Sequence, residues 1–227
     1  MDKGWIRLAG LAGIIFILLV AIPGFASGSP PDPSDPSSKF LSYYQDHRSA
    51  IVAGTFLAAV ADFFVVFFLG GLLIALRRLG GSAMLIVAAL AALILTGALA
   101  TTGGVFTISA AFRVGGSQHV DAETIRLLVD GSAIAFALLG PTVAAFLVAT
   151  GLMISKARHF PTWLAWVAWV GAALELVGSA SVFSTSGAFS PEGPLGLVFG
   201  LLPFAVFVLA TSIVMVTRGN AMESATA

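Results

Sequence analysis

Six long apolar stretches occupy most of this 227-residue chain, and they constrain its fold more than any other feature. A helix needs about 20 mainly apolar residues to cross the hydrocarbon core of a bilayer, and each stretch reaches that length. The sequence therefore predicts an all-α, polytopic membrane protein in which residues 1–227 form a single domain of six transmembrane helices. The predicted spans lie at about residues 5–25, 49–76, 82–110, 124–155, 161–184 and 195–216.

The composition supports a membrane protein and excludes several other classes. Only 10% of the residues are charged, whereas soluble domains contain roughly a quarter. The net charge is zero and no basic run occurs, so we expect the lipid bilayer, and not a nucleic acid, as a partner. The absence of cysteine excludes disulfides, thiolate catalysis and iron–sulfur ligation. We expect no cofactor.

The distribution of basic residues predicts how the helices are oriented. Short loops on the cytoplasmic side of a membrane carry an excess of Lys and Arg. One predicted side carries four basic residues, which are Lys39, Arg48, Arg113 and Arg126. The other carries seven, which are Lys3, Arg7, Arg77, Arg78, Lys156, Arg158 and Arg218. This excess places both termini in the cytoplasm and predicts a multi-pass protein of the cytoplasmic (inner) cell membrane.

The first span has two interpretations. Gly24 and Ala26 fit a small-residue cleavage site of a signal peptide. However, the apolar core from Leu8 to Phe25 is longer than the roughly 7–15 residues of a usual signal-peptide core. We therefore expect a retained transmembrane helix.

Residues 27–48 are predicted to form an outer loop that contains one short helix. The segment 27–38 is rich in Pro and Ser and is expected to be extended. Asp35 and Pro36 resemble a helix cap followed by a proline at the first helical position. Phe40 and Tyr44 follow at helical spacing, which favours an amphipathic helix at the membrane interface with Tyr44 as an anchor at headgroup depth. A ligand-binding lid is the alternative.

Two acidic residues, Asp62 and Glu175, lie deep inside predicted spans. An ionised group at mid-bilayer costs at least about 2.5–3.5 kcal/mol on insertion scales, so such residues usually face protein or water. On a helical wheel Asp62 shares its face with Thr55, Ala58 and Ala59, and phenylalanines lie opposite. Glu175 shares its face with five small residues, which are Ala168, Gly171, Ala172, Gly178 and Ser179. Small residues permit close helix packing, so we predict that both acids point into the bundle.

No Lys or Arg lies at the same depth as these acids, so at least one of them is expected to be protonated and to donate a hydrogen bond. The candidate partners are Thr55, Thr101, Thr102, Ser179 and Ser181. Two hypotheses remain open for this intramembrane polar site. The acids either hold helices together as neutral hydrogen-bonding groups, or they serve a proton or cation path.

Catalytic and metal-binding patterns are not visible. His47, His119 and His159 lie at or beyond the predicted membrane edges, which does not fit a haem or a metal site inside the bundle. Neither a Walker loop nor a nucleophile elbow occurs. We expect no metal, no catalytic residue and no enzymatic activity. Arg126 and Asp130 have the spacing of an interfacial ion pair.

Small residues and prolines predict local packing in the later spans. Gly196 and Gly200 form a small-xxx-small motif, which packs either a helix of the same chain, a second copy of the chain or another membrane protein. Pro141 and Pro203 lie inside spans and each is expected to kink its helix, because proline removes a backbone donor.

The order of several short motifs resembles one known family. Tyr43-Tyr44 and His47-Arg48 follow the Pro/Ser-rich loop, Arg77-Arg78 ends the second span, and the segment ARHFPTWL at 157–164 leads into the fifth. In these features the chain is similar to a bacterial family of six-helix inner-membrane proteins, common in actinobacteria, that is classified as a domain of unknown function. The resemblance implies the same fold and membrane, and it carries over no activity and no site residues.

These observations lead to two functional expectations. The first is a non-enzymatic membrane protein that is structural or accessory to a partner. The alternative is a small transporter or channel that uses Asp62 and Glu175 on a proton or cation path.

Overall fold

The computed structural model describes residues 4–26, 30–116, 120–191 and 193–224, and these residues form helices joined by short loops. The elements are α1 (Trp5–Ala26), α2 (Ser37–Asp46), α3 (Arg48–Arg78), α4 (Ala83–Val114), α5 (Ala122–Ala137), α6 (Leu139–Ile154), α7 (Thr162–Ser179), the 3₁₀ turn η1 (Ala180–Phe183) and α8 (Pro194–Ser224).

Within the described residues, six helical segments are long and apolar enough to cross a membrane, which confirms the predicted fold class. Five of them are built on α1, α3, α4, α7 and α8, and the sixth is α5 followed by α6. The molecule is therefore a multi-pass transmembrane protein by the length and composition of its helices.

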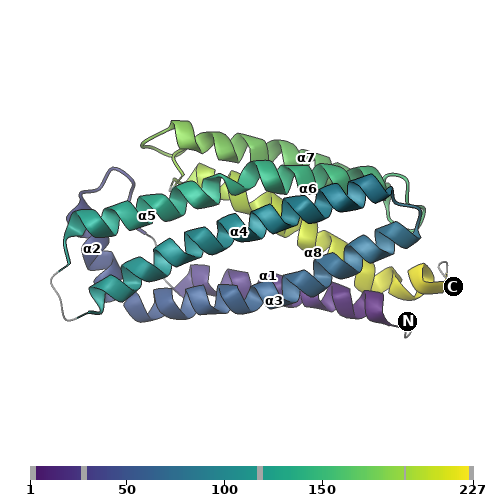
Figure 1. The fold of residues 1–227 in the computed structure, drawn as a ribbon, viewed down its shortest axis with the longest axis horizontal. Helices are drawn as coiled ribbons and strands as arrows, with labels where there is room; N and C mark the ends of the chain where they lie inside the picture. The colour runs from purple at the N-terminus through teal and green to yellow at the C-terminus, as the bar shows by residue number, and fades with distance from the viewer. Residues whose placement is uncertain (1–3, 27–29, 117–119, 192, 225–227) are drawn as a thin grey trace.

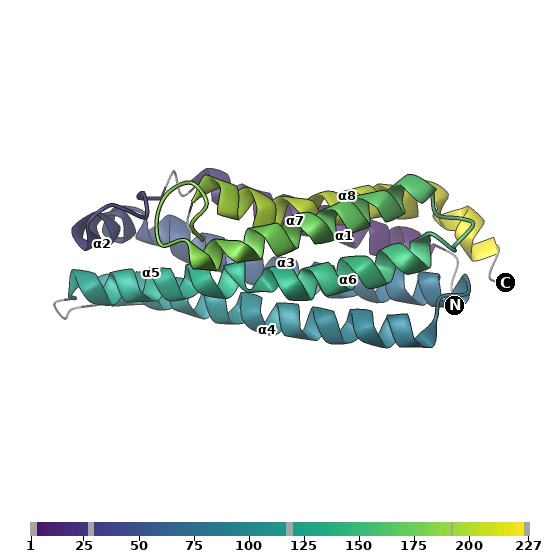
Figure 2. The same cartoon turned by 90° about the horizontal axis from the view of Figure 1, so that it is seen from above.

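The six segments form a closed ring in which each packs against its neighbours in the chain (Figure 1). The ring closes because α1 packs against α8, so that the first and last segments lie side by side. Both ends of the described chain lie at one end of the bundle, and α2 lies at the opposite end, as both Figure 1 and Figure 2 show. The contact between α3 and α4 is the sparsest between neighbours in this ring.

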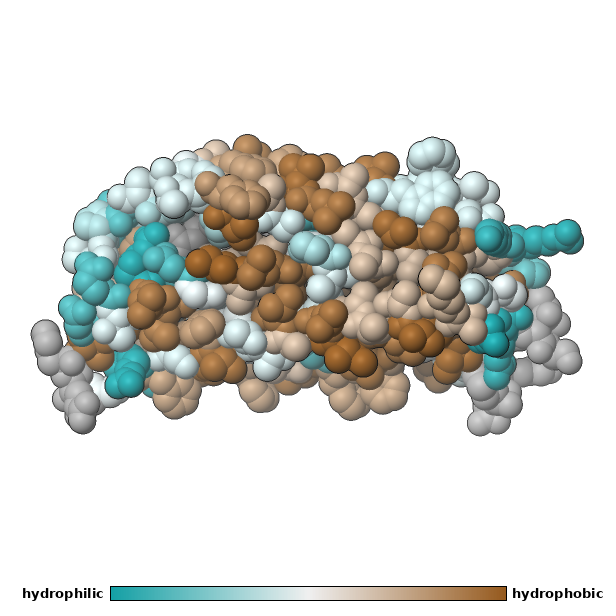
Figure 3. Space-filling view, turned by 45° about the horizontal axis from the view of Figure 1, so that its top comes forward, coloured by the Kyte–Doolittle hydropathy of each residue, from teal (hydrophilic) through white to brown (hydrophobic). Residues whose placement is uncertain are grey.

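The surface has the distribution that a bilayer requires. Figure 3 shows hydrophilic residues gathered at the two ends of the bundle and a broad hydrophobic band between them. Large apolar side chains such as Phe56, Val66, Ile94 and Trp166 are exposed in the helices that cross this band. Lipid chains would cover these side chains in a membrane.

Small residues allow α1 to pack closely between α3 and α8. A Cβ added at Gly71 would lie 2.3 Å from the Cβ of Ala9, and one added at Gly10 would lie 2.8 Å from the backbone oxygen of Ser212. Close approach of helix backbones is the usual basis of helix association in membranes. The core that results contains fully buried side chains from α3 and α8, including Phe68 and Phe207.

The fourth membrane segment is interrupted where the sequence predicts a proline kink. α5 ends at Ala137, four residues before Pro141, and α6 begins at Leu139. Proline offers no N–H to the carbonyl four residues earlier, and its ring presses against that same carbonyl. Pro203, by contrast, lies inside α8 without ending it.

The short helix α2 forms after Pro36 as predicted, but two details differ from the prediction. Pro36 itself occupies the cap position, and Asp35 accepts a hydrogen bond from Lys39 Nζ at 2.6 Å. Tyr44 is buried against α3, α4 and α5 together with Phe40, so it is not an anchor at the membrane interface. Because α4 and α5 extend beyond the other helices, they offer α2 an apolar surface of protein (Figure 1).

Candidate functional site

Glu175 is completely buried where α7 packs against α8, which confirms the prediction for this residue. The backbone N–H of Phe204 in α8 donates a hydrogen bond of 3.2 Å to its Oε1 atom. Its second oxygen, Oε2, is also buried and has no hydrogen-bond partner within the described part of the chain. One oxygen of the carboxyl group therefore links two helices, while the other is enclosed by the bundle.

Glycines bring the neighbouring helices very close to Glu175. A Cβ added at Gly140 of α6 would lie 2.3 Å from the backbone oxygen of Glu175. A Cβ added at Gly178 of α7 would lie 2.8 Å from the backbone nitrogen of Gly200 in α8. Side chains cannot be accommodated at such distances without displacing backbone. Glu175 is thus sealed between three helices that are held at close range.

The hydrogen bond from Phe204 lies beside Pro203, which is itself buried in α8. A proline inside a helix removes one backbone hydrogen bond and weakens the turn around it. The Oε1 atom of Glu175 accepts the N–H of the residue that follows this proline, so its observed contact is a hydrogen bond that links α7 to α8.

Asp62 does not point into the bundle, and the prediction for this residue is wrong. Its side chain is exposed on α3, as are Ala58 and Ala59 on the same stripe. The helical wheel treated small residues as the buried face and phenylalanines as the lipid face, and Phe63 and Phe67 are exposed as predicted. In the structure α1 packs on a different side of α3, where Phe68 and Leu72 are fully buried.

The stripe that carries Asp62 does face α4, but the two helices diverge along it. On α3 the exposure rises along one face of the helix, from buried Ile51 through partly buried Thr55 to exposed Asp62. On α4 it rises in parallel from buried Ala111 through partly buried Gly104 to exposed Gly97. A Cβ added at Gly97 meets no atom within 4 Å.

The contacts between the helices fix this register. The Nε atom of Arg48 donates a hydrogen bond of 3.0 Å to the backbone oxygen of Ala111, and a Cβ at Gly104 would lie 4.0 Å from Thr55. Continuing the antiparallel register by seven residues places Asp62 level with Gly97. We call the open surface between the helices at this level the α3–α4 seam. It consists of Ala58, Ala59, Asp62, Gly97, Ala98 and Thr101, all of them exposed.

The predicted hydroxyl partners do not bond either acid. Thr55 donates to the backbone oxygen of Ile51, and Thr102 and Ser179 likewise donate to carbonyls of their own helices, at 2.8–2.9 Å. Hydroxyls in helices often bond the preceding turn in this way. Thr101 is exposed on α4 and forms part of the α3–α4 seam.

The two acids also belong to different parts of the ring. α7 packs against α6 and α8, whereas α3 packs against α1 and α4, so α3 and α7 lie across the ring from each other. Glu175 is sealed inside and Asp62 faces outward. The single intramembrane polar site that the sequence suggests is therefore two separate sites.

The sequence analysis missed the hydroxyl pairs that link helices directly. Thr96 Oγ1 of α4 lies 2.8 Å from Thr142 Oγ1 of α6, and Thr107 Oγ1 of α4 lies 2.8 Å from Ser132 Oγ of α5. Single hydroxyls within apolar spans were the available signal, but spacing along one helix does not show which residue lies opposite on another. These pairs fix α4 against α5 and α6.

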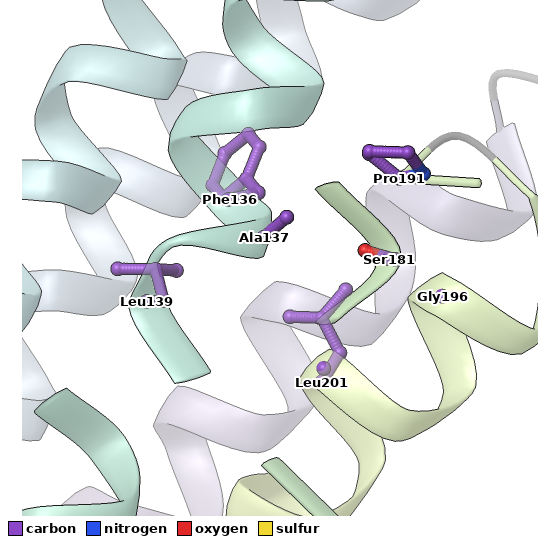
Figure 4. A pocket seen from close by; sticks show the side chains of 8 residues that line it. Phe136, Ala137, Leu139, Ser181, Pro191, Gly196 and Leu201 are labelled. Carbon is purple, nitrogen blue, oxygen red and sulfur yellow. The ribbon is translucent and has the colours of Figure 1, made fainter. Parts of the chain in front are cut away.

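A small pocket lies beside the α5–α6 break (Figure 4). Its volume is about 20 Å³, which is room for one water molecule. The Ser181 hydroxyl lines it and has no hydrogen-bond partner in the described structure. Gly196 and Gly200 line the same pocket, and a Cβ at Gly196 would lie 2.3 Å from the Ser190 backbone oxygen. This motif thus packs elements of its own chain, and its use in a homodimer stays a prediction.

A wider cleft of about 200 Å³ opens at the α2 end of the bundle. Arg126 and Asp130 lie in its wall and form the predicted ion pair, with Nε 2.8 Å from Oδ1. The guanidinium of Arg126 also lies 4.1 Å from the centre of the Phe40 ring, which holds α2 against α5. The ion pair therefore lies within α5, and the contact of Arg126 with Phe40 fastens α2 to it.

Among the described residues, no three His, Asp or Glu side chains come close enough together to hold a metal ion. His119 lies outside the described residues. His47, which lies between α2 and α3, contacts α2, with Nδ1 at 3.0 Å from the backbone oxygen of Tyr43. The histidines that can be placed therefore gather no ligands around them.

Comparison with protein-family models, with curated proteins and with solved structures gives no match to this chain.

Proposed function

We propose that this chain is a non-enzymatic accessory protein of the cell membrane that assembles with another membrane protein through the α3–α4 seam. The observation that carries this proposal is the exposed carboxyl group of Asp62 in the middle of a transmembrane helix. An acidic side chain directed at lipid costs at least about 2.5–3.5 kcal/mol when it is ionised. A protein surface placed over the seam removes that cost.

The seam also has the composition of a helix-packing surface. Ala58, Ala59, Gly97 and Ala98 present little side-chain volume, so another helix can approach the backbone closely. Thr101 adds a hydroxyl that can bond across the contact. α4 supplies half of the seam. It is also the least covered of the six segments, since only 11% of its apolar stretch is buried within the described chain.

Sequence patterns support the placement of this protein in the membrane. The excess of basic residues at the end that carries both termini favours a cytoplasmic location of the termini. The resemblance to six-helix inner-membrane proteins of bacteria favours the cytoplasmic membrane. A reporter enzyme fused to each terminus tests the orientation, which is wrong if the reporters are active outside the cytoplasm.

Single-cysteine cross-linking tests the assembly, because the chain contains no cysteine of its own. An Ala98→Cys variant carries a thiol in the seam, and a Trp166→Cys variant carries one on the exposed face of α7 as the control. In native membranes a thiol-to-amine cross-linker is expected to join Ala98→Cys to one defined protein and to leave Trp166→Cys unjoined. Equal and diffuse labelling of the two variants would show that the seam faces lipid.

A proton- or cation-coupled transporter is the second candidate, and the enclosed Oε2 oxygen of Glu175 is the observation that favours it. Such an oxygen can carry a proton within the bundle. The test compares proton and cation flux in liposomes for the unaltered chain and for Asp62→Asn and Glu175→Gln. Flux that depends on either acid supports transport, and unchanged flux in folded variants removes this candidate.

A further inference from the structure

The depth of Asp62 defines the chemistry that its partner must supply. Asp62 lies 14 residues after Arg48 and 15 before Arg77, the two basic residues that bound α3. At 1.5 Å per residue it is about 21 Å along the helix from either of them. The hydrocarbon core is about 30 Å thick, so the carboxyl group lies near its centre.

The described part of the chain offers no cation at that depth. Each Lys and Arg within residues 4–26, 30–116, 120–191 and 193–224 lies outside the helices or within about two turns of a helix end. Arg48, at one end of α3, is held by the Ala111 carbonyl. A second copy in the same orientation has the same distribution of charge. If two copies joined seam to seam, Asp62 would meet another Asp62, and neither copy would supply a cation to it.

We infer, building on the proposed function, that the occupant of the α3–α4 seam is a transmembrane helix of a different protein with a Lys or Arg at mid-membrane depth. This cation pairs with Asp62, and the small residues on both walls admit the helix backbone. The pairing neutralises two charges that would each be unfavourable in lipid, so each partner stabilises the other in the membrane. The seam thereby selects a helix by one charge at one depth.

The test uses the full chain in lipid vesicles, labelled at a cysteine introduced at exposed Ser38 of α2. The probes are three synthetic leucine–alanine transmembrane peptides with Lys, Gln or Leu at the centre, labelled for energy transfer. We expect the Lys peptide to bind about tenfold more tightly than the Leu peptide, with Gln between them. Asp62→Asn is expected to abolish this preference while circular dichroism shows an unchanged helix content.

A Gly97→Leu variant separates this inference from the proposed function. Leucine fills the open space at Gly97 but leaves Asp62 in place, so it is expected to block all three peptides. If the Lys and Leu peptides bind equally to the unaltered chain and Gly97→Leu blocks both, a helix docks in the seam but the cation inference is wrong. If Gly97→Leu has no effect, the seam is not the docking surface and both proposals fall. Energy transfer between labelled copies without peptide, abolished by Gly97→Leu, would overturn the inference by assigning the seam to a second copy.

Discussion

Asp62 and Glu175 have similar sequence surroundings and opposite environments in the structure. Each lies within a long apolar helix on a stripe of small residues. At Glu175 the small residues of α6, α7 and α8 are in close contact, and the carboxyl group is sealed and bonded to Phe204. At Asp62 the small residues of α3 and α4 face open space, and the carboxyl group is exposed.

The difference shows that a stripe of small residues marks the capacity for close packing and not the identity of the packing partner. α7 finds its partners within the chain, since α6 and α8 flank it and both offer glycines. α3 has used a different face to pack against α1, and it diverges from α4 at mid-depth. The small residues of the α3–α4 seam can therefore still pack against a helix from another protein.

The strongest test of this comparison replaces one glycine from each region by alanine. At Gly140 the new methyl group would overlap the Glu175 backbone, so we expect a loss of about 1–3 kcal/mol in unfolding free energy. At Gly97 the methyl group meets open space, and replacing a helical glycine is expected to stabilise the fold by about 0.5–1 kcal/mol. Unfolding in mixed detergent micelles, followed by circular dichroism, measures both. Shifts of the same sign would contradict the comparison.

The acids themselves give the second test. Glu175→Leu removes the acceptor of the Phe204 N–H in a sealed site, and we expect it to destabilise the fold by about 1–2 kcal/mol. Glu175→Gln retains an acceptor oxygen and is expected to lose less. Asp62→Leu breaks no hydrogen bond within the described chain and is expected to leave the fold at least as stable in lipid. The same unfolding assay compares the three variants, and an unstable Asp62→Leu would place that acid among the structural residues.

The hydroxyl pair of Thr96 and Thr142 provides an intermediate reference, because it links two helices without a charge. Valine preserves the shape of threonine, so a double-mutant cycle of Thr96→Val and Thr142→Val isolates the hydrogen bond. We expect a coupling energy of about 0.6 kcal/mol, the average for such bonds in membranes. A coupling near zero would mean that packing alone holds α4 against α6.

The smallest effect is expected at the turn before α2, where carboxyl groups lie in water and give a baseline for the two membrane acids. The Lys39 ammonium holds the pKa of Asp35 below its ordinary value of 3.8, and the Ser34 hydroxyl does the same for Asp32. A lowered pKa means that the fold favours the ionised carboxylate, so this contribution is complete at neutral pH and is lost as the pH falls through the lowered pKa. NMR titration of the Asp32 and Asp35 side chains checks the direction of both pKa shifts. Titration midpoints above 3.8 would contradict the prediction.

The sequence by itself determined the architecture. The apolar lengths fixed six membrane segments, and Pro141 marked the break between α5 and α6. The spacing of Arg126 and Asp130 showed an ion pair. The stripe around Glu175 predicted the burial of this acid, whereas the same argument failed at Asp62. These features follow from bilayer thickness, from helix geometry and from the missing N–H of proline, and all of these act within one segment.

Only the tertiary structure decided which face of each helix meets a partner. The sequence of α3 does not state that α1 will pack over Phe68 and Leu72 and leave Phe63 exposed. The pairing of Thr96 with Thr142 likewise depends on how two helices are rotated against each other. The physical reason is that lipid and protein interior are equally apolar, so hydrophobicity does not distinguish the two faces of a membrane helix.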